Sequence, residues 1–227
     1  MKNESKARLS QRAAWSAGQP ISDLMARALA APNLISLAAG FVDQHTLPVE
    51  ATRHASELLL GDTIDAQAAL QYGTTHGYPR LREAIRDRHL QADGGAASQP
   101  SIDLDQIVLT AGSNQLLHLV SESLLDPGDI VLCAAPTYFV YLGTLQNVGA
   151  RAIGVRTDAD GIIPDSLKEA LRRLEADGLL PRVKAVYVVT YFDNPCGLTV
   201  PAERRRQIVE IAQRWSQEQT IHVIADD

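Results

Sequence analysis

Hydrophobic and polar positions are irregularly spaced in the first part of the chain and regularly spaced beyond residue 100. In the first part, amphipathic stretches at 49–60 and 78–91 predict two helices. Beyond residue 100, short apolar runs of strand length alternate with stretches of helical spacing. The predicted strands are residues 107–110, 130–133, 152–155, 183–189 and 221–225. The predicted helices are residues 114–125, 138–147, 164–176 and 202–217.

This alternation indicates the class of fold. The run at 183–189 is β-branched and almost wholly apolar, which is typical of a strand covered on both faces. Strand and helix alternate five times after residue 106. We therefore predict an α/β domain with a mostly parallel sheet and helices on both faces. Turn-forming residues at 93–100 predict a short linker ahead of it.

Composition narrows the class of protein without changing this architecture. The 227 residues are 45% hydrophobic and 21% charged, as in ordinary globular proteins. A net charge of −6 argues against a general affinity for nucleic acid or membrane surfaces. No apolar stretch approaches the ~18 residues of a membrane span. Residues 1–12 lack the apolar run of a secretory signal, so we expect a cytoplasmic protein. Cys133 and Cys196 lie in dissimilar contexts and the 6 histidines show no ligand spacing, so we expect neither a disulfide framework nor a metal site.

In open parallel sheets, ligands bind outside the carboxyl ends of the strands, so the residues that follow each strand matter most. The first strand is followed by Gly112, Ser113 and Asn114, which open directly into a helix. A glycine-containing turn at a helix N-terminus offers N–H groups and a positive dipole end to a phosphate. The alternative is that Ser113 only caps the helix.

The other strand ends carry further candidates. Tyr138 follows the second strand and could offer a flat face to a planar ligand or be structural. Asn194 follows 183–189 and precedes Pro195 and Gly197, which is also ordinary turn chemistry. Asp226 and Asp227 end the chain; a carboxylate there could pair with a cationic ring nitrogen or cap a turn.

The order of these residues resembles a known family. The matching set is Tyr72-Gly73, Gly77 and Leu81-Arg82, then Thr110-Ala111-Gly112-Ser113, then Pro136 and Tyr138, then Asn194-Pro195 and Gly197, then Asp226. It resembles the fold type I, pyridoxal-phosphate-dependent aminotransferases of class I/II, and is most similar to the kynurenine and 2-aminoadipate branch. The resemblance covers roughly residues 30–227 and matches the N-terminal part of such enzymes.

The resemblance implies cofactor contacts for individual residues. Gly112 and Ser113 would hold the phosphate of pyridoxal 5'-phosphate, together with Asn114, where the family often has Gln. Tyr138 would stack on the pyridine ring, and Asn194 would hydrogen-bond its phenolic oxygen.

The resemblance leaves two candidate carboxylates to pair with the ring nitrogen. Asp226 would pair with the pyridinium nitrogen and keep it protonated. The adjacent Asp227 is the alternative.

Two further residues are implied outside the cofactor contacts. Tyr72 would reach the phosphate of the partner subunit in a homodimer, and Gly40 would lie where the substrate carboxylate binds. Their alternatives are a packed core aromatic and a turn glycine.

The resemblance implies transamination between an amino acid and a 2-oxo acid. In this family the Schiff-base lysine lies beyond the segment that matches Asp226, so we expect no catalytic residue within the chain. The alternatives are an inactive remnant and a non-catalytic ligand-sensing module. The implied organisation is an arm and short helix at 1–30, part of a small domain at 31–100, and a cofactor-binding large domain at 101–227.

Overall fold

The computed structural model describes residues 8–16, 24, 26–28, 30, 31, 33, 35, 42–92, 102–217 and 219–227. The chain forms two compact units. We call residues 1–23 with 112–227 the sheet unit and residues 24–111 the helical unit. The predicted division at residues 30 and 100 stays a prediction.

The sheet unit contains α1 (Gln11–Trp15), α6 (Ser113–Leu124), β1 (Ile130–Ala135), α7 (Phe139–Asn147), β2 (Arg151–Asp158), β3 (Gly161–Ile162), α8 (Pro164–Ala176), β4 (Val183–Val189), α9 (Ala202–Trp215) and β5 (His222–Asp226). The helical unit contains a 3-10 turn at Gln44–Thr46, α3 (Val49–Gly61), α4 (Thr63–Leu70), α5 (Pro79–Ala92) and a second 3-10 turn at Leu104–Gln106. The short helices α1 and α4 and the strand β3 were not predicted from the sequence. The short helix expected within residues 1–30 lies partly outside the described residues.

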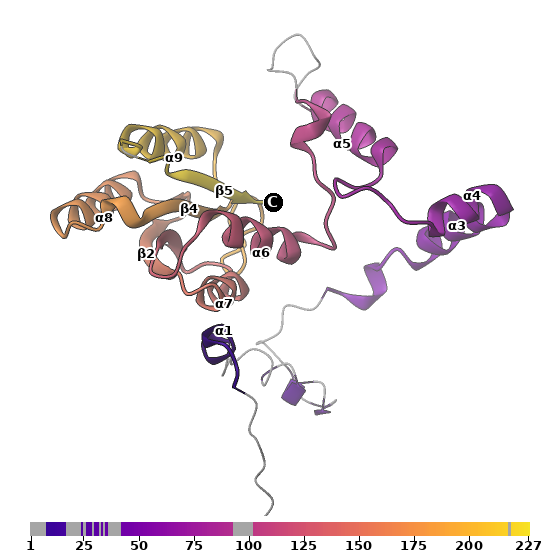
Figure 1. Cartoon of the computed structure of the whole chain (residues 1–227), viewed down its shortest axis with the longest axis horizontal. Helices are drawn as coiled ribbons and strands as arrows, with labels where there is room; N and C mark the ends of the chain where they lie inside the picture. Colours follow the sequence, from indigo (N-terminus) through magenta and orange to yellow (C-terminus); the bar gives the residue numbers. More distant parts are fainter. Residues whose placement is uncertain are drawn as a thin grey trace, which may run out of the picture. The chain divides into compact units, whose positions relative to one another are not determined.

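The five strands of the sheet unit lie in the order β3-β2-β1-β4-β5 (Figure 1). All neighbouring pairs are parallel except β2 with β3, which is antiparallel. The predicted α/β fold with a mostly parallel sheet is therefore confirmed. In the β4–β5 pair, Val189 lies beside Asp226 and Tyr187 beside Ile224. With this register, the carboxyl ends of β4 and β5 lie side by side.

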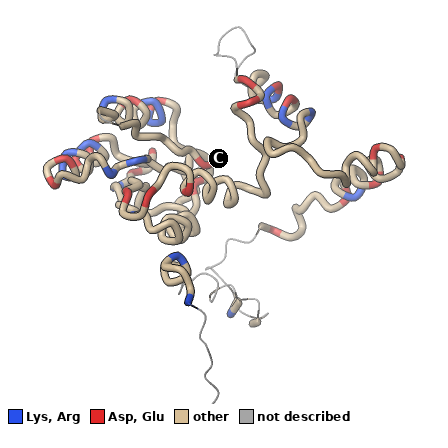
Figure 2. The backbone as a smooth tube through the Cα atoms, viewed as in Figure 1, with Lys and Arg blue, Asp and Glu red and all other residues tan. Residues whose placement is uncertain are grey.

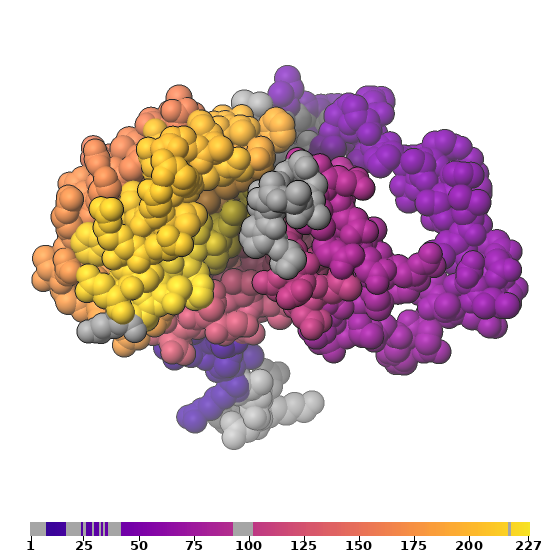
Figure 3. Space-filling view, turned by 90° about the horizontal axis from the view of Figure 1, so that it is seen from above, coloured from indigo at the N-terminus to yellow at the C-terminus, as the bar shows by residue number. Residues whose placement is uncertain are grey.

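Helices cover both faces of this sheet. On one face, α8 and α9 pack against the sheet through a core that includes Leu167, Leu171 and Ile208. On the other face, α6 and α7 pack through Leu117 and Tyr141. The space-filling view shows α9 and the end of the chain forming one continuous surface of the unit (Figure 3). The central strand β4 is buried from both sides, as its apolar sequence predicts.

The sequence of α8 shows how one helix is directed onto the sheet. Pro164 occupies the first turn, where its missing N–H costs nothing, and Asp165 follows at the positive end of the helix. Leu167, Leu171 and Leu174 recur at helical spacing and are buried. Basic and acidic residues both occur along α8 and α9 (Figure 2).

The predicted strand at 107–110 is wrong, because these residues belong to no strand. Within the helical unit, their backbone groups pair with other partners. The guanidinium of the buried Arg82 donates to the Ile107 carbonyl at 2.8 Å, and the Leu109 N–H donates to the His76 carbonyl at 3.0 Å. A short apolar run cannot by itself show whether a neighbouring strand is available.

Candidate cofactor-binding site

A small cavity opens at the carboxyl ends of β4 and β5 in the sheet unit. Its volume is about 170 Å³. Its lining residues are Ser113, Tyr138, Val189, Phe192, Asn194, Asp226 and Asp227. The fold thus brings four separately predicted residues, from four segments of the chain, to one place. Their individual roles stay predictions.

One wall of the cavity is the start of helix α6. Gly112 is its N-cap residue, with a φ of 85°, and Ser113 is the first residue of the helix. The alternative that Ser113 caps the helix is therefore wrong, because Gly112 occupies that position. The N–H groups in the first turn of a helix point beyond its N-terminus, which carries a positive partial charge. A hydroxyl beside such a helix end is suited to bind a phosphate.

Tyr138 forms the adjoining wall between β1 and α7. It is half-buried and is the N-cap residue of α7. Its hydroxyl lies 3.4 Å from the Oδ1 atom of Asn114, to which it donates. This contact joins the aromatic wall to the start of α6, so the ring position and the predicted phosphate position are linked.

The loop after β4 closes the cavity from the opposite side. Thr190 is buried and continues the sheet, since its N–H donates to the Asp226 carbonyl at 3.2 Å and its carbonyl accepts from Val200 at 2.8 Å. Phe192 has a φ of 49°, an unusual value for a residue with a side chain. Asn194 is exposed and follows in the same loop. The exposed amide is therefore held by a loop that the sheet anchors.

A buried carboxyl group lies directly before Asn194. Asp193 is 5% exposed, and its Oδ1 atom has no hydrogen-bond partner among the described residues. Burial raises the pKa of this carboxyl group. The loop therefore holds an acid whose charge is poorly solvated.

The two carboxylates at the end of β5 differ in their contacts. Asp226 is half-buried, and its Oδ2 atom accepts a hydrogen bond of 2.7 Å from the Tyr187 hydroxyl. Asp227 is exposed, and its Oδ1 atom accepts from the Thr190 hydroxyl. Both carboxylates line the cavity, and Asp226 is the less exposed of the two.

Other predicted residues do not line this cavity. Tyr72 is in the helical unit and is 99% exposed, so the alternative of a packed core aromatic is wrong. Gly40 lies outside the described residues. In the part of the chain that the structure describes, the lysines are elsewhere: Lys168 pairs with Asp165 at 3.1 Å on α8, and Lys184 is at the start of β4.

Sequence reasoning missed three residues of the site. Val189 and Phe192 line the cavity, and the Tyr187 hydroxyl donates a hydrogen bond to Asp226. The alternation of side chains along β4 could have placed Tyr187 and Val189 on the same face. Which face holds the cavity depends on the neighbouring strand, which the sequence does not identify.

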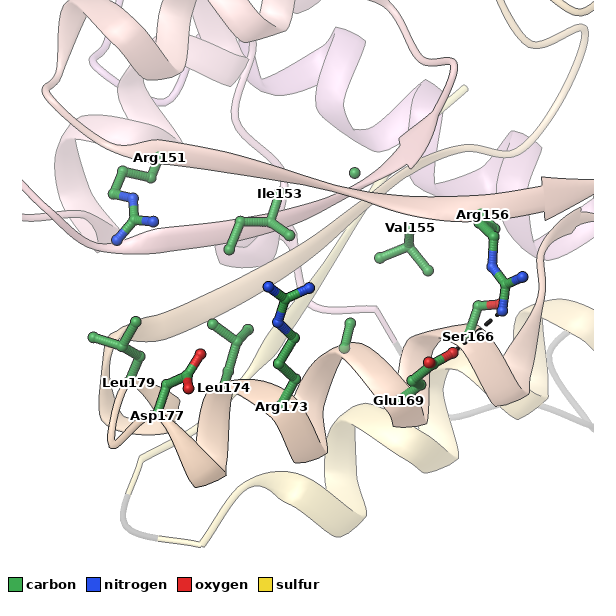
Figure 4. Close-up of a pocket in the computed structure, with 12 residues that line it drawn as sticks. Arg151, Ile153, Val155, Arg156, Ser166, Glu169, Arg173, Leu174, Asp177 and Leu179 are labelled. Carbon is green, nitrogen blue, oxygen red and sulfur yellow. Dashed lines mark hydrogen bonds and ion pairs between the residues drawn. The ribbon is translucent and has the colours of Figure 1, made fainter.

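A larger cavity of about 500 Å³ lies between β2 and α8 (Figure 4). Arg151, Arg156 and Arg173 line it together with apolar residues, and Arg156 pairs with Glu169 at 3.2 Å. None of its lining residues is aromatic. It runs along the side of β2 and not across the carboxyl ends of the strands. It therefore offers neither an aromatic side chain to stack on a planar ring nor the location where ligands of such sheets bind.

Among the described residues, no group of three histidine, cysteine or carboxylate side chains is placed to hold a metal ion. No helix of the described parts has the length and apolar character to cross a bilayer.

Comparisons with known proteins agree with one another. The family described as aminotransferase class I and II matches residues 32–227. An aromatic-amino-acid aminotransferase of Thermococcus litoralis is 34% identical over 187 residues, which cover 81% of this chain and 42% of that protein. The mitochondrial kynurenine/alpha-aminoadipate aminotransferase of Bos taurus is 31% identical, with 81% and 45% covered. The crystal structure of a Pyrococcus horikoshii kynurenine aminotransferase has a TM-score of 0.81 and 31% identity, over 96% of this chain and 50% of that chain. The chain spans about half the length of these proteins.

Proposed function

Because the chain belongs to the aminotransferase class I and II family, whose members depend on pyridoxal phosphate, we propose that the cavity beside α6 and β5 binds pyridoxal 5'-phosphate. The observation that carries this proposal is the donor set of the cavity. A hydroxyl at a helix N-terminus, a tyrosine ring, an amide and a carboxylate line one space. These are the groups that suit a phosphate, a planar ring, a phenolic oxygen and a cationic ring nitrogen.

Each residue has a defined part in this proposal. Ser113 and the start of α6 bind the phosphate, and Tyr138 covers one face of the ring. Asn194 donates its amide to the phenolic oxygen. Asp226 holds the proton at the ring nitrogen. When bound, pyridoxal phosphate supplies an electron sink for the α-carbon of an amino acid.

We further propose that the reaction is the transfer of an amino group between an amino acid and a 2-oxo acid. Val189 and the exposed Phe192 give the cavity an apolar part to its lining. Transamination also needs a lysine amine at the cavity, and neither lysine of the described regions lies there. Binding of the cofactor is therefore the part of the proposal that this chain tests most directly.

We also propose a homodimer. Tyr72 is almost fully exposed, so its side chain is available to a second subunit. The helices α3 and α4 nearby in sequence expose Leu58, Leu59, Leu60 and Ile64. Exposed apolar side chains grouped in this way are typical of surfaces that another chain covers.

The test is a calorimetric titration with pyridoxamine 5'-phosphate, the amine form of the cofactor, which needs no lysine. We expect saturable binding, and weaker binding of pyridoxamine without its phosphate. Asp226→Asn removes a charged hydrogen bond and should weaken binding roughly 10- to 100-fold. Asp165→Asn, at the exposed start of α8 and outside the cavity lining, is the control and should change little. Absence of saturable binding to the wild type would refute the proposed function.

A further inference from the structure

The hydroxyl of Tyr187 makes a hydrogen bond that the proposed cofactor contacts leave unexplained. Tyr187 is in the middle of β4 and is 0% exposed. Its hydroxyl lies 2.7 Å from the Oδ2 atom of Asp226, to which it donates. A tyrosine this deep could have been replaced by phenylalanine without losing apolar contact. The hydroxyl therefore has a use that packing does not account for.

The strand register explains how the two side chains meet. Tyr187 lies beside Ile224, and Val189 lies beside Asp226. Because side chains alternate in direction along a strand, Tyr187, Val189 and Asp226 all face the α6 and α7 side of the sheet. The long phenol ring spans the two-residue offset and reaches the carboxylate from the core. This hydrogen bond is made by Oδ2 of Asp226 and so does not occupy Oδ1.

A second tyrosine fixes the ring of Tyr187. The rings of Tyr141 and Tyr187 have centroids 4.1 Å apart, and Tyr141 is also 0% exposed. The hydroxyl of Tyr141 points away to α6, where it lies 3.2 Å from the Ser121 hydroxyl. In a close-packed core, a ring held on its face and at its edge has little freedom to turn.

Both hydroxyl groups remain protonated at neutral pH. Burial raises the pKa of Tyr141 to about 12. Burial, with the hydrogen bond to Asp226, also raises the pKa of Tyr187. The Tyr187 hydroxyl is therefore a hydrogen-bond donor at neutral pH.

We propose that Tyr187 is a positioning residue, which fixes the Asp226 carboxylate so that Oδ1 faces the ring nitrogen of the cofactor. This inference rests on the proposed function. A carboxylate at the end of a strand can rotate about its terminal bond. Binding one oxygen to a rigid buried donor selects one orientation before the cofactor arrives, and so removes part of the ordering cost of binding.

The test compares two ligands that differ at one atom. Pyridoxamine 5'-phosphate has the ring nitrogen, and its 1-deaza analogue has a C–H group at that position. We expect Tyr187→Phe to weaken binding of pyridoxamine 5'-phosphate about tenfold and to leave binding of the analogue unchanged. Tyr141→Phe removes a hydroxyl of the same buried pair that does not contact Asp226. It should change the binding of neither ligand.

The possible results separate the explanations. Equal weakening of both ligands by Tyr187→Phe, or no weakening of either, would overturn the positioning role. Failure of the wild type to bind pyridoxamine 5'-phosphate would overturn the proposed function itself. Phenylalanine keeps the ring and its contact with Tyr141, and the half-exposed Asp226 can then bind water. Thermal melting of each variant checks that the fold is retained. If Tyr187→Phe does not fold, the ¹⁵N shift of the ring nitrogen in ligand bound to wild type reports its partner, and a neutral nitrogen contradicts the proposal.

Discussion

Two neighbouring carboxylates at the end of β5 show how much single residues depend on their surroundings. The sequence predicts that one of them pairs with a ring nitrogen and leaves both candidates open. Asp226 is half-buried and hydrogen-bonded to Tyr187, whereas Asp227 is exposed and bonded to Thr190. Both line the cavity, and their different hydrogen bonds follow from the packing of β4 and of the loop after it. Residue types could be predicted here, and their contacts could not.

Asp193 provides a test at the same scale through pH. Its pKa is raised by burial, so the folded state binds a proton more tightly than the unfolded state. The stabilising effect of this proton is full below the ordinary pKa of the group, and it is lost as the pH rises through the folded-state pKa. Asp193→Asn should therefore raise the melting temperature at pH 7, as measured by thermal denaturation.

This advantage should shrink as the pH falls through the raised pKa of Asp193, because the wild-type carboxyl group then becomes neutral as well. The exposed Glu83 of α5 offers a control, since Glu83→Gln should alter stability by less than about 0.5 kcal/mol at either pH. A lower melting temperature of Asp193→Asn at pH 7 would mean that the charge is stabilising in the folded loop.

At the scale of elements, most helices and strands could be predicted because their own side chains carry the pattern. The helix α8 has its proline, its acidic first turn and its buried leucines in the expected places, and β4 is apolar throughout. The run at 107–110 could not be assigned in the same way. Its apolar residues suit a strand, but Arg82 and His76 take its backbone groups. Strand formation needs a neighbour, and local pattern does not report one.

The start of α6 can be tested as an element with a matched pair of glycines. Gly112 has a φ of 85° and Gly178 a φ of 69°, and an added Cβ would meet nothing within 4 Å at either position. Alanine should therefore destabilise both sites through backbone strain alone, by about 1–2 kcal/mol. Gly112→Ala should also weaken binding of pyridoxamine 5'-phosphate relative to pyridoxamine, and Gly178→Ala should not. Equal phosphate preference in the two variants would exclude α6 as the phosphate site.

The whole molecule combines a sheet unit that contains the candidate site with a helical unit that contains Tyr72. The ordered set of motifs was sufficient to predict the family, whose model matches residues 32–227. The fold class was predicted from the alternation of strand and helix patterns beyond residue 100. The cavity itself could not be predicted, since it depends on how β5 registers against β4 and on the path of the loop after β4.

The most direct measurement is a crystal structure of the chain with pyridoxamine 5'-phosphate. We predict that the phosphate binds at the start of α6 beside Ser113, that the ring lies against Tyr138, and that the ring nitrogen is within hydrogen-bonding distance of Asp226. A ligand bound instead between β2 and α8, or one whose ring nitrogen points away from Asp226, would contradict the account.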